Sequence, residues 1–129
     1  MFNEKSPKKY DLEERTARFE ESIIIFSKIT PVNLVTQRII PQLVAAGTSI
    51  GANYCEADDV ESGKDFKHKI GICKKEARET TYWLRIISTA APELKERAGI
   101  LWQEAKELHL IFNTIYRKVN AKNLEIRHS

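Results

Sequence analysis

Apolar residues repeat at alternating steps of three and four along most of this chain. The clearest row lies between residues 63 and 89, where apolar or small side chains recur without interruption. The row is Phe66, Ile70, Cys73, Ala77, Thr80, Leu84 and Ile87. This spacing places all of its members on one face of a helix that packs against other helices. We therefore predict a long helix from about Gly63 to Thr89.

An earlier helix is expected to begin at Leu12 and to end at Thr30. Asp11 suits the capping position because its side chain can accept a bond from a free N–H of the first turn. Pro31 should end the helix, since the residue before a proline avoids helical backbone angles. The run from Ile23 to Phe26 is apolar around most of the helix. This helix is therefore expected to contact more than one neighbour, another subunit being one candidate.

A helix between these two is predicted from about Asn33 to Ala57. Pro41 lies inside its apolar pattern and should kink the helix or delay its start by a turn, because proline lacks a backbone donor. Gly47 and Gly51 lie four residues apart on it. Each costs about 1 kcal/mol relative to alanine in a helix, so we expect them to allow another backbone to come close.

The last helix is predicted from Pro92 to about Lys122. Residues 1–10 and 123–129 are expected to be loose tails of a single domain that comprises residues 1–129. Four long helices with short connections predict an all-α fold, an antiparallel up-down-up-down four-helix bundle.

The second and third predicted helices should form a hairpin that turns near residues 61 and 62. Residues equally far from the turn then face each other across the two helices. The predicted pairs are Glu56 with Lys67, Ile50 with Cys73, Ala46 with Ala77, and Ile39 with Leu84.

Five polar side chains on this hairpin need an explanation, because a plain core would be apolar. They are Ser49, Asn53, Glu56, Glu76 and Glu79. A buried polar group without a partner costs about 1–3 kcal/mol. We therefore interpret these residues as a structural polar network that fixes helix register, either within the hairpin or between subunits, and favour this interpretation over a catalytic role.

Composition limits the class of protein. The chain has 129 residues, of which 42% are hydrophobic and 30% charged, as in a globular domain. Its apolar runs fall short of the roughly 20 residues of a membrane span, and the N-terminus lacks the apolar core of a signal peptide. We expect a cytoplasmic protein without membrane partners.

Enzyme chemistry is not indicated. A carboxylate metal site in a four-helix bundle needs Glu-x-x-His motifs, which none of the histidines provides. The spacing of Cys55 and Cys73 suggests neither a disulfide framework nor a zinc site. Nucleophile elbows and phosphate-binding loops are also missing from the sequence. We therefore expect no catalytic residues, no bound metal and no cofactor.

Positive charge is concentrated on the third predicted helix and at the chain ends, although the net charge is only +3. The candidate nucleic-acid-binding residues are Lys64, Lys67, Lys74, Lys75, Arg78 and Arg85 on the third helix, with Arg117, Lys118 and Lys122 near the end of the fourth. Four of these follow the apolar row by one position and so form a stripe beside the core. A stripe of this kind attracts phosphates when an oligomer repeats it, although in monomers it is more often a solvated face.

Four aromatic residues lie on the same two helices. They are Tyr82, Trp83, Trp102 and Tyr116. Their rings could stack on bases, but aromatic residues at helical spacing more often anchor a core or an interface.

Three segments of the chain resemble a known bacterial family. They are Ser49–Ala57, Asp65-Phe66 and Lys75–Leu84. The family comprises proteins of 23S rRNA intervening sequences, often labelled "S23 ribosomal protein", and the resemblance extends from Leu12 to Lys118. It implies a four-helix bundle that forms a ring-like homopentamer. A group related to this family comprises accessory proteins of diversity-generating retroelements. These are barrel-shaped pentamers that bind nucleic acid and a reverse transcriptase.

The resemblance and the basic stripe together favour a non-enzymatic, homo-oligomeric protein that binds RNA or DNA. The alternative is a protein-interaction scaffold that presents helix faces to a partner such as a reverse transcriptase. The two functions differ in whether the basic residues are needed for partner binding.

Overall fold

The structure is a computed structural model that describes residues 11–60 and 62–128, with side chains as far as residue 119. Its elements are α1 (Leu12–Ile29), α2 (Thr36–Gly47), α3 (Ser49–Asp59), α4 (Gly63–Ala90), the 3-10 helix η1 (Pro92–Leu94) and α5 (Lys95–His128). The described residues contain no strand, so the all-α prediction is confirmed for them. The expected loose tail at residues 1–10 lies outside the described residues.

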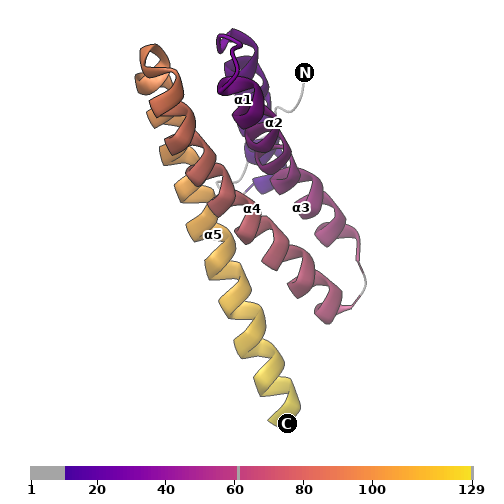
Figure 1. Cartoon of the computed structure of the whole chain (residues 1–129). Coiled ribbons are helices and arrows are strands. Elements are labelled where there is room, and N and C mark those ends of the chain that lie inside the picture. The colour runs from indigo at the N-terminus through magenta and orange to yellow at the C-terminus, as the bar shows by residue number, and fades with distance from the viewer. Residues whose placement is uncertain (1–10, 61, 129) are drawn as a thin grey trace.

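Four helical segments make up the fold, because α2 and α3 follow each other as one bent segment. Figure 1 shows α1 leading to one end of the molecule and α2 and α3 leading away from that end. The long α4 returns to the same end, and α5 then lies side by side with α4. The last helix continues to His128, beyond the predicted end near Lys122.

The predicted start of α1 is confirmed, and a similar cap begins α4. The Asp11 side chain accepts a hydrogen bond from the N–H of Glu14 at 3.2 Å. The Ser62 side chain accepts one from the N–H of Asp65 at 3.0 Å. Each cap gives a partner to a donor that lacks one within its own helix, which is why the helices begin at these positions.

The helix predicted between Asn33 and Ala57 is divided in two at Thr48. Its first part begins only at Thr36, where the Asn33 side chain accepts bonds from the N–H groups of Val35 and Thr36 at 2.9 Å each. Pro41 lies inside α2 without ending it. The interruption thus falls after Gly47, about two turns beyond the proline.

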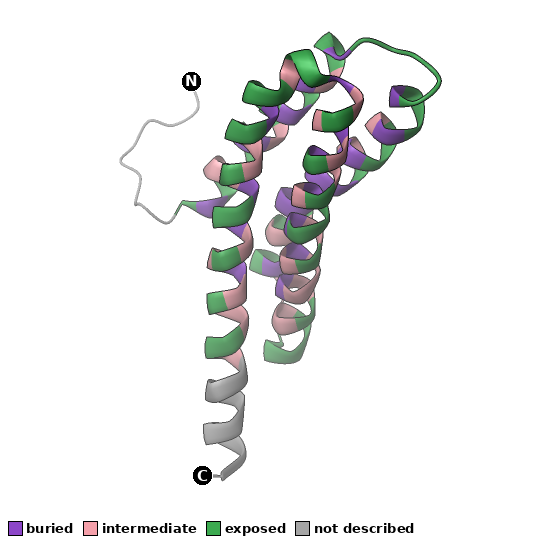
Figure 2. Ribbon diagram, turned by 60° about the vertical axis from the view of Figure 1, so that its left-hand side comes forward, coloured by how far each residue is buried: buried purple, intermediate pink, exposed green. Residues whose placement is uncertain are grey.

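The buried core contains the predicted apolar row of α4. Its members Ile70, Cys73, Ala77, Thr80, Leu84 and Ile87 are all 0% exposed, and Phe66 is half-buried. On α5 the matching buried residues are Ala98, Ala105, Leu108 and Phe112. Figure 2 shows the buried residues on the sides of the helices that face one another.

The two glycines of the bent segment allow α1 to come close, although the nearest atoms belong to side chains and not to another backbone as predicted. A methyl group on Gly47 would lie 3.1 Å from the Ile23 side chain. On Gly51 it would lie 2.7 Å from the carboxylate of Glu20 and 2.8 Å from the hydroxyl of Thr16. At Gly51 these distances are too short for a normal contact, so a side chain there would force Thr16 and Glu20 to shift, whereas at Gly47 the contact would only be tight.

The hairpin of α3 and α4 has the predicted register at its centre but not near the turn. The Cys73 thiol lies 3.4 Å from the backbone oxygen of Ile50, as donor to it. Glu56, however, pairs with Lys69 and not with Lys67. Residues two apart are separated by about 200° around the helix axis. Lys67 and Lys69 therefore point to nearly opposite sides of α4 and contact different neighbours.

Candidate nucleic-acid interface

A groove of about 630 Å³ runs between α4 and α5 and carries most of the predicted stripe. Its lining comprises Lys74, Lys75, Arg78, Glu79, Thr81, Tyr82, Arg85, Trp102 and His109. Four of these side chains are cations and one is a carboxylate. The groove is therefore strongly positive, whereas the whole chain has a net charge of only +3.

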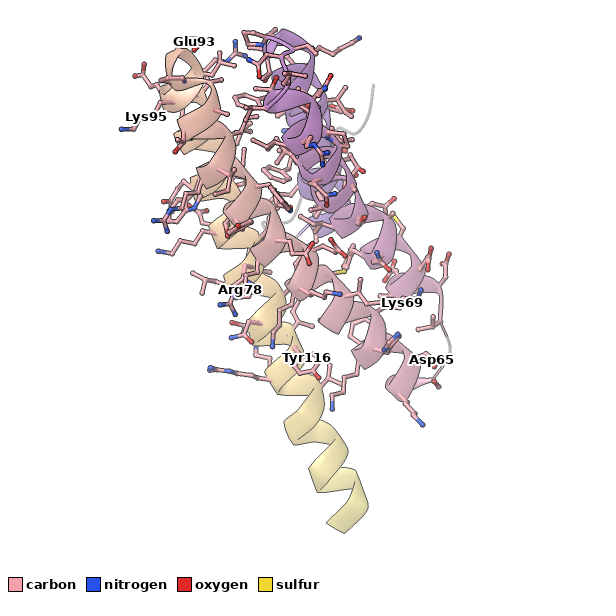
Figure 3. The ribbon with its side chains drawn as sticks, viewed as in Figure 1. Asp65, Lys69, Arg78, Glu93, Lys95 and Tyr116 are labelled. Atoms are coloured by element: carbon pink, nitrogen blue, oxygen red, sulfur yellow. The ribbon has the colours of Figure 1, made fainter. Side chains whose placement is uncertain are left out.

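The helical period of α4 explains why these cations border the groove. Lys74, Arg78 and Arg85 each follow a fully buried residue of the core row. One step along a helix is about 100°, so their side chains leave the core at its edge, beside α5. Figure 3 shows Arg78 on the α5 side of α4.

On the opposite wall, Trp102 and His109 belong to a row on α5 that repeats every seven residues. Its members are Lys95, Trp102, His109 and Tyr116. A spacing of seven keeps side chains on one face of a helix. The sequence-based prediction missed Lys95 and His109, although this regular spacing was a signal from which both could have been found.

His109 fastens the two walls of the groove. Its Nδ1 lies 3.1 Å from the backbone oxygen of Lys74. A carbonyl oxygen can only accept, so Nδ1 carries the hydrogen and donates it. The imidazole thus links α5 to the backbone of α4 directly beneath the groove.

Tyr116 holds two of the predicted lysines in place. The Lys74 ammonium lies 4.5 Å from the centre of its ring, and that of Lys67 lies 5.2 Å from it. Both distances suit a cation–π interaction. The ring itself packs on the backbone of Gly71, where a methyl group would lie 3.1 Å from Cε1. Figure 3 shows Tyr116 between the two helices.

A second hollow of about 480 Å³ continues the groove toward the start of α5. It is lined by Leu84, Arg85, Ser88, Thr89, Lys95, Ala98, Gly99 and Trp102. Arg85 and Trp102 line both hollows, so the two are adjoining. Together they extend from Lys74 to Thr89 on α4, a distance of about 20 Å at 1.5 Å per residue.

Three other predicted cations do not line the groove. Lys64 is exposed in the first turn of α4, and Arg117 and Lys118 are exposed on α5 beyond Tyr116. The side chain of Lys122 lies outside the described residues. The groove thus brings together Lys74, Lys75, Arg78 and Arg85, with Lys67 beside them on the same tyrosine.

The five residues predicted as a polar network are not joined by hydrogen bonds between their side chains within the described part of one protomer. The Ser49 hydroxyl donates to Ala45 O at 2.5 Å and the Asn53 amide donates to Ser49 O at 2.8 Å, both within the bent segment. Glu56 pairs with Lys69. Glu79 lines the groove. A role of these residues between protomers stays a prediction.

Two carboxylates, Glu76 of this set and Glu20 on α1, have raised pKa values. Burial raises the pKa of Glu76, and the nearby charge of Glu79 raises it further. Burial also raises the pKa of Glu20 to about 7, which the hydrogen bond from Gly51 partly offsets. Glu20 links α1 to α3 by accepting a hydrogen bond from the backbone N–H of Gly51. The sequence did not indicate this link, because a backbone N–H on another helix leaves no mark in the residue pattern.

The described residues contain no group of three or more His, Cys, Asp and Glu side chains that could hold a metal ion. Among the helices described, none is both long and apolar enough to cross a membrane.

Comparison with known proteins gives a family match and matches among solved structures. The model of a family described as "23S rRNA-intervening sequence protein" matches residues 8–114. A crystal structure from Bacteroides thetaiotaomicron VPI-5482, of a protein with unknown function from the S23 ribosomal protein family, has a TM-score of 0.70 and 29% sequence identity. The match covers 81% of this chain and 96% of that chain. No curated protein matches the chain.

Proposed function

This chain belongs to the 23S rRNA-intervening sequence protein family, and from that premise we propose that it is a non-enzymatic, homo-oligomeric protein that binds RNA or DNA in the groove between α4 and α5. The observation that carries the proposal is the grouping of Lys74, Lys75, Arg78 and Arg85 along one groove. The proposal includes the cytoplasmic location expected from the sequence.

The charges of the groove support binding to phosphates rather than to a small anion. Its cations are distributed from Lys74 to Arg85, over about 16 Å of helix, a length that several successive phosphates of a strand would occupy. Arg78 and Arg85 are exposed, and their guanidinium groups can each bond a phosphate through two N–H donors. Binding of this kind releases counterions and therefore weakens as salt rises.

A ring-like homopentamer of antiparallel up-down-up-down bundles is part of the same proposal. Large apolar side chains are exposed near the end where α1 finishes and α5 begins: Ile25 is 55% exposed, Val32 74%, Leu34 81% and Ile100 69%. An apolar hollow of about 260 Å³ lies between Ile25 and Ile100. Exposed apolar surface of this kind favours association, and association would repeat the basic groove around the ring.

The assembly can be tested by light scattering at micromolar concentration. We expect a pentamer for the natural chain and smaller species for Leu34→Glu, which places a charge on the most exposed apolar residue named above. A natural chain that is monomeric under these conditions would contradict the assembly.

The alternative function is a scaffold that presents its helices to a protein partner such as a reverse transcriptase. The same exposed apolar residues support it, because they could contact another protein instead of a second copy. A scaffold would keep its partner after nuclease treatment. It would also keep that partner when Lys74 and Arg78 are changed to glutamate, since neither belongs to the apolar surface.

A mobility-shift titration tests nucleic-acid binding itself. The expected result is a shifted band at low salt that weakens as salt increases. Absence of binding at low salt, or an affinity that is indifferent to salt, would exclude the proposed function.

A further inference from the structure

Tyr82 lies in the middle of the basic groove and is exposed to solvent. It follows Arg78 by four residues and precedes Arg85 by three, so all three share one face of α4. Its side chain is 55% exposed although it lines the groove. A large aromatic ring thus lies open to solvent between two arginines.

The other aromatic residues in or beside the groove are already covered. Trp102 is half-buried, and the Lys106 ammonium lies 5.2 Å from the centre of its ring. Tyr116 carries Lys67 and Lys74. Tyr82 differs, because its contact with Trp83 is edge to face, with centroids 5.0 Å apart and planes at 79°. This contact restrains the ring without stacking on it.

Basic residues alone would bind single strands and duplexes through their phosphates. An exposed ring among them adds a surface on which a base can stack. In a duplex both faces of each base are covered by the neighbouring bases. In an unpaired strand a base can turn one free face to the tyrosine ring. The exposed ring therefore distinguishes the two forms of nucleic acid where the charges do not.

We propose that the groove between α4 and α5 takes single-stranded nucleic acid, with one base stacked on Tyr82 and the flanking phosphates bound by Arg78 and Arg85. This inference rests on the proposed nucleic-acid-binding function and names the form of nucleic acid that the site prefers. The stacking is indifferent to base identity, since every base has an aromatic face.

The test is fluorescence anisotropy with one labelled DNA strand of about 16 nucleotides, used alone and annealed to its complement. The natural chain should bind the single strand more tightly than the duplex. Tyr82→Ala should weaken single-strand binding by about 5- to 100-fold, the effect of losing one stacked base, and leave duplex binding unchanged. Tyr82→Phe should keep the natural affinity because it keeps the ring.

Controls separate failure of the inference from failure of the function. Arg78→Glu should weaken binding of both forms, because it removes a phosphate contact and no ring. Equal losses for both forms in Tyr82→Ala, or no loss at all, would overturn stacking at Tyr82 while leaving nucleic-acid binding intact. Absence of binding of either form to the natural chain would overturn the proposed function and the inference with it. Light scattering of each variant shows whether a loss arises from altered assembly, which would also overturn the stacking role.

Discussion

The carboxylate of Glu20 on α1 accepts a hydrogen bond from the backbone N–H of Gly51 on α3 at 2.5 Å. Gly51 lies in the first turn of α3, where N–H groups have no partner within their own helix. The interruption at Thr48 thus provides a donor, and α1 supplies the acceptor. A carboxylate at the start of a helix also suits the helix dipole. The interruption, the glycine and the acid therefore form one structural feature.

This feature predicts that Gly51→Ala destabilises the protein by about 1–3 kcal/mol, because the added methyl group would overlap Glu20 and Thr16. Gly99→Ala is the matched control. It adds the same methyl group inside α5, where no atom lies within 4 Å, and should stabilise the protein by up to about 1 kcal/mol. Urea unfolding of both variants measures the difference. Equal effects would show that α1 does not pack closely on Gly51.

Stability should depend on pH through Glu20. Burial raises its pKa to about 7 from an ordinary value of 4.5, so the folded protein binds this proton more tightly than the unfolded chain. Its contribution to stability is complete below pH 4.5 and is lost as the pH rises through 7. Because the carboxyl is only half-buried, solvent screening reduces the loss to about 1 kcal/mol.

Glu20→Gln removes this titration and keeps an oxygen that can accept from Gly51. The variant should therefore gain stability over the natural chain as the pH rises from about 5 to about 8. Urea midpoints at several pH values check this. Parallel pH profiles for the two proteins would contradict a raised pKa at Glu20.

The pairing of Glu56 with Lys69 predicts a small coupling that is absent for Lys67. Both partners are partly exposed, so a double-mutant cycle with alanine should give about 0.2–1 kcal/mol for Glu56 and Lys69. The same cycle with Lys67 should give none, because that side chain lies over Tyr116. If Glu56 were coupled to Lys67 and not to Lys69, the pairing seen in the structure would be contradicted and the pairing predicted from the sequence supported.

Arg15 should contribute more to stability than its neighbour Arg18. Arg15 joins α1 to α5 through Glu104 at 2.7 Å and Glu107 at 2.9 Å. Arg15→Ala should cost about 1–2 kcal/mol, after allowance for its partial exposure. Among the described residues Arg18 pairs with Glu14 on its own helix, and it is 75% exposed, so Arg18→Ala should cost about 0.3 kcal/mol. Thermal or urea unfolding of the two variants measures both costs. Equal costs would contradict the larger contribution of Arg15.

The sequence predicted α4 and its buried row because six core positions follow the helical period without interruption. It did not predict the interruption at Thr48, because the buried residues Ala46 and Ile50 keep their spacing across it. What stabilises the interruption is Glu20, which is distant in sequence. Hydrophobic spacing carries no information about such a partner.

The sequence predicted the α4 side of the basic groove better than its α5 side. The α4 cations follow the core row by one position, so the sequence alone placed them beside the core. On the α5 wall Trp102 was named as a ring that could stack on bases, but Lys95 and His109 were missed although all three repeat every seven residues. Only the packing of α5 on α4 shows that the two rows face each other across one groove.

The most direct test of the basic groove is the salt dependence of nucleic-acid affinity in charge-reversal variants. Lys74→Glu and Arg78→Glu together should weaken binding and reduce the slope of log Kd against log salt by about 2, close to one unit for each lost phosphate contact. Lys28→Glu reverses an exposed charge near the end of α1, outside the groove, and should change neither. If the groove variant bound with the affinity and slope of the natural chain, or if Lys28→Glu matched its loss, the account would be contradicted.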